Sequence, residues 1–141
     1  AAEGVMSIFS DSYTDVEGTN FNPDWGQATA STIVEIATDN SAIKYQGLNY
    51  QGTQFASALN VSAYQYIHID YWTADSTALN FFLISTGPQE TAKALDVATK
   101  GEWVSVDIPL SDFTGVDLSD VIQFKVDGNG TVFFDNIYFH N

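Results

Sequence analysis

Asp135 and Asp11 are two acidic residues whose positions favour metal chemistry. Asp135 lies in the apolar run 132–139, in the same alternating phase as phenylalanine and isoleucine side chains, and a carboxylate there needs hydrogen bonds or a cation. Asp11 follows the apolar run 6–9. Terminal strands often lie side by side in two-sheet sandwiches, so we expect the two carboxylates to approach each other. The chain has no arginine to pair with them, so the sequence predicts a structural Ca²⁺ ion, which prefers oxygen ligands. The alternative is that Asp135 caps a turn or accepts backbone N–H groups.

Aromatic residues are the second group with a chemical signature, with 3 Trp, 7 Tyr and 10 Phe in the chain. Trp and Tyr rings on a solvent-facing surface suit a ligand that has apolar faces and hydroxyl edges. Sugars have this character, because their C–H faces stack on rings while their hydroxyls pair with amides and carboxylates. The alternative for each ring is ordinary packing, which we expect for Trp103. The predicted ligand-binding residues comprise three rings and three polar neighbours: Trp25, Tyr50, Trp72, Gln51, Asp70 and Gln123.

Residues for catalysis are sparse. The chain has no cysteine and only two histidines, His68 and His140, and it lacks the G-x-S-x-G sequence of a serine nucleophile. A glycosidase needs only two carboxylates beside one sugar bond, and 18 acidic residues leave such a pair available. The glutamates are nevertheless scattered along the chain. We therefore expect a protein that is not an enzyme.

The charge balance restricts the partners. With 4 basic and 18 acidic residues, the formal net charge is −14. Such a chain repels nucleic acid and anionic lipid surfaces, so we expect neither as a partner. It should also repel anionic glycans, which leaves neutral polysaccharides as the glycan class. No run approaches the roughly 18 apolar residues of a membrane span, so we expect no membrane insertion.

Alternating apolar and polar residues, typical of β-strands, recur along most of the chain. Turn-forming pairs that contain Gly, Asn, Asp or Pro separate these segments. About ten strands exceed one small open sheet. The sequence therefore predicts an all-β fold, a two-sheet antiparallel β-sandwich of the jelly-roll kind, as one domain over 1–141. The expected strands are 4–10, 31–37, 42–46, 51–56, 64–72, 78–85, 91–98, 102–108, 121–127 and 130–140.

The alternation also predicts which side chains face the core. In 66–72, the phase that contains Asp70 and Trp72 should point outward, opposite Ile67, Ile69 and Tyr71. In 122–127, the predicted inward residues are Ile122, Phe124 and Val126, which leaves Gln123, Lys125 and Asp127 outside.

Five runs resemble non-catalytic carbohydrate-binding modules: 9–16 (FSDSYTDV), 49–52 (NYQG), 66–75 (YIHIDYWTAD), 101–110 (GEWVSVDIPL) and 132–139 (VFFDNIYF). These modules accompany laminarinases and the surface glycan-binding proteins of marine Bacteroidota. The runs 101–110 and 132–139 are general to jelly-roll modules and therefore bear on fold more than on ligand. The resemblance extends from about Val5 to Phe139.

The resemblance implies an extracellular or cell-surface module of a multimodular protein. It implies non-catalytic binding of a neutral β-glucan, of the laminarin β-1,3 type, which brings a hydrolase or uptake system to polysaccharide. It also implies a structural calcium that joins the terminal strands, with Asp135 in the closing motif and Asp11 as its partner. The alternatives are a small β-sandwich glycoside hydrolase and an adhesion or spacer domain. A polysaccharide lyase would need positive charge beside its acidic sugar, which four lysines supply poorly.

Overall fold

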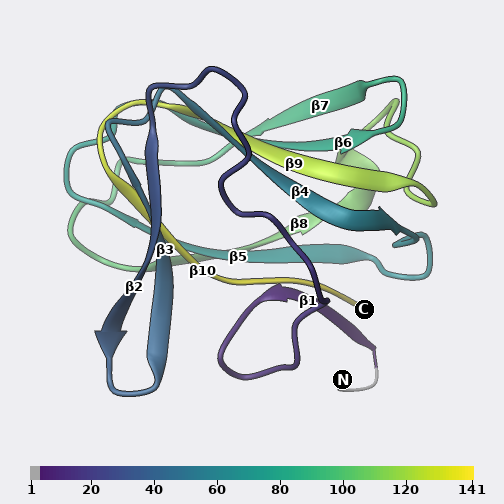
Figure 1. Cartoon of the computed structure of the whole chain (residues 1–141), viewed down its shortest axis with the longest axis horizontal. Coiled ribbons are helices and arrows are strands. Elements are labelled where there is room, and N and C mark those ends of the chain that lie inside the picture. The colour runs from purple at the N-terminus through teal and green to yellow at the C-terminus, as the bar shows by residue number, and fades with distance from the viewer. Residues whose placement is uncertain (1–3) are drawn as a thin grey trace.

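The computed structural model describes residues 4–141, which form two antiparallel sheets and one short 3₁₀ turn (Figure 1). The predicted all-β sandwich is confirmed. No helix in this part of the chain is long and apolar enough to cross a membrane. The elements are β1 (Val5–Phe9), β2 (Ala30–Ala37), β3 (Asn40–Gln46), β4 (Tyr50–Leu59), β5 (Tyr66–Thr73), β6 (Leu79–Ser85), β7 (Gln89–Ala94), β8 (Val104–Pro109), η1 (Leu110–Asp112), β9 (Val121–Gly128) and β10 (Val132–His140).

The six-stranded sheet has the order β2-β3-β10-β5-β8, and β1 pairs with the far end of β10. The four-stranded sheet has the order β4-β9-β6-β7. Their inner faces bury alternate residues, among them Ile67, Ile69 and Tyr71 of β5 and Phe124 and Val126 of β9. The core therefore lies between the sheets, and each sheet turns one face to solvent.

The terminal strands lie side by side, as predicted. β1 pairs with β10 from Val5 opposite His140 to Phe9 opposite Ile137, and β1 runs beside the last part of β10 in Figure 1. This pairing brings the segment that follows β1 against the middle of β10. There the Ser10 hydroxyl donates a hydrogen bond to Asn136 Oδ1 at 2.8 Å.

Two bulges change the predicted facing of side chains. In β10 the register shifts between Asp135 and Tyr138, and Asn136 has φ of 49°. Before the shift, Phe133 pairs with Trp72 and Asp135 with Asp70, two residues on the outer face of β5, so Phe133 and Asp135 share one phase as predicted. Beyond the shift, Ile137 and Phe139 face the core, so the prediction that Asp135 also shares their phase was wrong. In β9 a second shift buries Val121 in place of Ile122, which was predicted to face the core.

Candidate functional site

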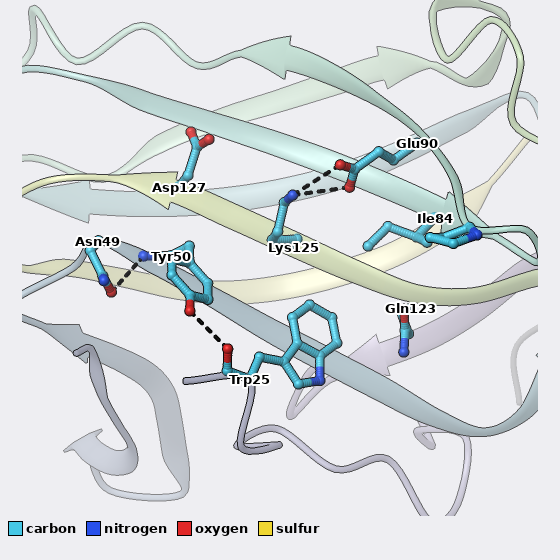
Figure 2. Close-up of a pocket in the computed structure, with 9 residues that line it drawn as sticks. Trp25, Asn49, Tyr50, Ile84, Glu90, Gln123, Lys125 and Asp127 are labelled. Atoms are coloured by element: carbon cyan, nitrogen blue, oxygen red, sulfur yellow. Dashed lines mark hydrogen bonds and ion pairs between the residues drawn. The ribbon is translucent and has the colours of Figure 1, made fainter. Parts of the chain in front are cut away.

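A groove lies on the solvent face of the four-stranded sheet and has a volume of about 570 Å³. It is bounded by the loop before β2 and by residues of β4, β6, β7 and β9 (Figure 2). Alternation in β4 creates this face: Gln51 and Thr53 point into the core, so Tyr50 and Gly52 lie on the outer side. The lining residues are Trp25, Asn49, Tyr50, Ile84, Pro88, Glu90, Gln123, Lys125 and Asp127.

Trp25 and Tyr50 form an aromatic platform at one side of the groove (Figure 2). The Tyr50 hydroxyl donates to the Trp25 carbonyl oxygen at 2.8 Å. The indole covers Gly52 so closely that a Cβ there would lie 2.4 Å from Trp25 Cζ3. The backbone N–H of Trp25 donates to Gln27 Oε1 at 2.8 Å. These contacts hold the half-buried Trp25 ring in place against the sheet.

Polar side chains of β9 form the floor. Lys125 Nζ pairs with Glu90 at 3.0 Å and lies 4.2 Å from the centre of the Phe82 ring. Asp127 Oδ1 accepts a hydrogen bond from Asn80 at 2.9 Å. Gln123 lies on the same side of β9 and lines the groove together with Trp25 (Figure 2). The floor therefore offers a cation, carboxylates and an amide beside two aromatic rings.

Of the predicted ligand-binding residues, the structure brings Trp25, Tyr50 and Gln123 together in this groove. Gln51 lies beneath it, fully buried. Its amide nitrogen donates to the Gly52 carbonyl oxygen at 3.1 Å and its amide oxygen accepts from Gln27 at 3.2 Å. Gln51 thus supports the Trp25 loop from inside.

The structure places Asp70 and Trp72 on the outer face of the six-stranded sheet, away from the groove. Asp70 accepts hydrogen bonds from Ser105 and Asn136 and contacts His68. Trp72 packs edge-on against Phe133, with 5.5 Å between ring centres. Trp103 lines a shallow apolar hollow with Trp72 and is 43% exposed, so it is less covered than the predicted packing would give.

Sequence reasoning did not select several groove residues. Lys125 and Asp127 were correctly predicted to face outward with Gln123, and that shared phase was the signal that could have grouped them. Asn49 and Glu90 carry no comparable signal, because Asn49 precedes a strand and Glu90 comes from β7, which joins the groove only through tertiary structure.

The predicted metal ligands lie in β10 of the six-stranded sheet, for Asp135, and in the loop after β1, for Asp11, near enough for the two charges to interact. Asp135 is 5% exposed and accepts the backbone N–H of Asn136 at 2.8 Å. Burial raises the pKa of Asp135 to about 6; the Asn136 N–H opposes this shift, and the negative charges of Asp11, Asp70 and Asp15 reinforce it. A buried carboxylate among like charges favours a cation as a compensating partner.

The carboxylates of Asp135 and its acidic neighbours Asp11, Asp15 and Asp70 form an acidic cluster. Its chemistry fits Ca²⁺, which takes several oxygen ligands. Asp11 and Asp135 are the residues that would hold the ion. Asp11 Oδ2 accepts the Ser41 N–H at 2.7 Å, so it is also tied to the start of β3. Within residues 4–141, the one group of three His, Asp or Glu donors that lie within 4.8 Å of one another is His68, Asp107 and His140. The carboxylates of Asp11 and Asp135 would therefore have to move together to bind the ion.

No protein-family model matches the sequence, and no curated protein matches it. Solved structures do resemble it. One is the family 11 carbohydrate-binding module from Clostridium thermocellum in complex with a beta-1,3-1,4-mixed-linked tetrasaccharide: it has a TM-score of 0.67 and 17% identity, and the match covers 100% of this chain and 98% of that one. The family 30 module of a cellulosomal cellulase from the same organism has a TM-score of 0.62, 15% identity and 97% coverage of both chains.

Larger enzymes also contain a similar sandwich. An agarase matches with a TM-score of 0.67 and 13% identity over 99% of this chain, but this chain spans only 25% of that enzyme. These likenesses establish the fold, a two-sheet β-sandwich like that of carbohydrate-binding modules.

Proposed function

We propose that this protein is a non-catalytic carbohydrate-binding module that holds a neutral β-glucan in the groove of the four-stranded sheet. The observation that carries the proposal is the platform of Trp25 and Tyr50 beside the polar floor of β9. Ring faces stack on the C–H faces of a sugar, while amide, ammonium and carboxylate groups pair with its hydroxyls. The similar fold of a module solved with a mixed-linked β-glucan tetrasaccharide supports this choice of ligand class.

A laminarin-type β-1,3-glucan is the ligand we propose within that class. The preference for a neutral glycan rests on the formal net charge of −14, which repels anionic polymers. The β-1,3 linkage rests on the sequence resemblance to modules that accompany laminarinases.

Binding without cleavage is the activity we propose for the groove. Its two carboxylates are held by neighbours, Glu90 by Lys125 and Asp127 by Asn80. A glycosidase instead needs one carboxyl free to give up a proton and a second placed on the sugar. The lining contains no imidazole among the described residues.

We further propose that the module works outside the cell as part of a larger protein, where it concentrates substrate for an attached or neighbouring hydrolase or uptake system. The presence of a similar sandwich as a quarter of an agarase supports this arrangement. Weak binding by one groove would then be strengthened by neighbouring modules.

The proposed function is tested by titrating the protein with soluble laminarin, mixed-linkage β-glucan and alginate, and by assaying each mixture for new reducing ends. We expect binding to a neutral β-glucan, little binding to alginate and no reducing ends. Released reducing ends would favour the glycoside hydrolase, and binding to none of the neutral glucans would favour an adhesion or spacer domain.

Gly52→Ala should weaken glucan binding although no groove side chain is removed. The new Cβ would lie 2.4–2.6 Å from three atoms of the Trp25 ring, so the indole has to move off the sheet. Because the indole is the end of a side chain on a loop, we expect the affinity to fall more than the free energy of unfolding. Calorimetric titration and denaturant unfolding of the variant measure the two effects. An unchanged affinity would mean that the position of Trp25 is unimportant.

A further inference from the structure

Three potential metal ligands converge on the outer face of the six-stranded sheet, opposite the groove. They are His68 of β5, Asp107 of β8 and His140 of β10, and their donor atoms all lie within 4.8 Å of one another. Asp107 Oδ1 is 2.9 Å from His68 Nδ1 and 2.7 Å from His140 Nε2. Three neighbouring strands thus direct two imidazoles and one carboxylate to the same point.

The second nitrogen of each imidazole already has an acceptor. His68 Nε2 is 2.7 Å from Asp70 Oδ1, and Asp70 also accepts hydrogen bonds from Ser105 and Asn136. His140 Nδ1 is 3.0 Å from the backbone oxygen of Asn141. A carboxylate and a carbonyl can only accept, so each of these ring nitrogens must donate its hydrogen.

This arrangement leaves the inner nitrogens of the neutral imidazoles without hydrogens. Their lone pairs, on His68 Nδ1 and His140 Nε2, then face the oxygen of Asp107, so either a second proton on the rings or a metal ion has to supply positive charge between them. A metal-bound histidine commonly donates its other N–H to a carboxylate or a backbone carbonyl. Both histidines here have that outer partner.

We propose that His68, Asp107 and His140 bind one divalent transition-metal ion of the Zn²⁺ class. Two imidazoles and one carboxylate favour such an ion over Ca²⁺, which takes oxygen ligands. Zn–N and Zn–O bonds of roughly 2.1 Å in a tetrahedron place ligand atoms about 3.4 Å apart. The present separations of 2.7 and 2.9 Å from Asp107 require it to move outward by roughly half an ångström.

The surroundings keep the histidine rings in place and leave Asp107 free to adjust. His68 stacks on Tyr138 with 4.8 Å between ring centres, and His140 stacks on Tyr66 at 5.4 Å. The Asp107 side chain is 51% exposed, against 15% for His68 and 23% for His140. The fourth position of the ion therefore opens to solvent, where water or an external ligand can enter.

A metal ion here would join three strands on the sheet opposite the glucan groove. It would link the edge strand β8 to β5 and to the end of β10. Because the ion binds only the folded arrangement, it should stabilise the native state. The site shares no residue with the groove, so metal and glucan should bind independently.

The test is a calorimetric titration of untagged, chelator-treated protein with ZnCl₂ at about pH 7.5, together with melting curves. We expect one zinc ion per chain and a higher melting temperature. His140→Gln and Asp107→Asn should each weaken binding about tenfold or more. Glu35→Gln, which removes one exposed charge from β2, should bind zinc as the parent does.

The only two histidines in the chain also give a direct spectroscopic test. The ring resonances of both His68 and His140 should shift when one equivalent of zinc is added. The proposal is overturned if millimolar zinc does not bind the parent, because a proton then supplies the positive charge in the cluster. It is also overturned if the His140→Gln and Asp107→Asn variants retain parental affinity.

Discussion

Trp25→Ala should weaken laminarin binding by about 1–3 kcal/mol, or roughly fivefold to 150-fold in Kd, while the protein remains folded. The half-buried indole provides the largest aromatic surface of the groove, and truncation removes both contact area and ring–sugar attraction. Calorimetric titration gives the affinity, and circular dichroism confirms the fold.

Trp72→Ala is the matched control for that experiment. It removes the same side chain from the outer face of the opposite sheet, where Trp72 contacts Phe133. We expect parental affinity for laminarin in this variant. If Trp72→Ala loses the affinity and Trp25→Ala keeps it, the glucan binds to the six-stranded sheet and the groove is the wrong site.

Asp135→Asn should make the calcium-free protein more stable at about pH 7.5 and abolish its response to calcium. The substitution removes a buried negative charge that lies near Asp11, Asp70 and Asp15. The new amide oxygen can still accept the Asn136 N–H. A pKa change from 3.8 to about 6 corresponds to a gain of about 1–3 kcal/mol, after allowance for solvent screening. Denaturant unfolding with chelator and with CaCl₂ measures both effects.

The gain in stability from Asp135→Asn should depend on pH. The folded-state pKa of Asp135 is raised to about 6, above the reference value of 3.8. The folded state therefore binds this proton more tightly, so the contribution of Asp135 to stability is fully present below about pH 4 and is lost as the pH rises through about 6. The advantage of the Asn variant over the calcium-free parent should grow across this window. A calcium-free variant that is less stable than the parent at about pH 7.5 would contradict the cost assigned to the buried charge, and a variant that still responds to calcium would exclude Asp135 as a ligand.

The strands and the sandwich could be predicted because alternation is a local property of the sequence. The predicted segment 31–37 corresponds to β2 and the segment 121–127 to β9. The bulges could not be predicted in this way. One extra residue at Ile122, or at Asp135 and Asn136, reverses the facing of the neighbouring residues in the strand, and only the partner strand reveals it.

The site was harder to predict because alternation distinguishes inside from outside but does not assign a strand to a sheet. Asp70 and Trp72 do face outward as predicted, yet β5 pairs with β8 and β10 rather than with β9. Trp25 reaches the groove from a loop, where it lies on Gly52. That contact depends on long-range packing, which the spacing of residues does not encode.

The most direct test of glucan binding in the groove uses the indole N–H resonances of the three tryptophans during titration with a laminarin oligosaccharide. Trp25 lines the groove, whereas Trp72 and Trp103 lie together at the apolar hollow on the other sheet. We predict that the Trp25 resonance shifts progressively with ligand while the other two stay in place. A shift confined to Trp72 and Trp103, or no shift in any indole at saturating ligand, would contradict the account.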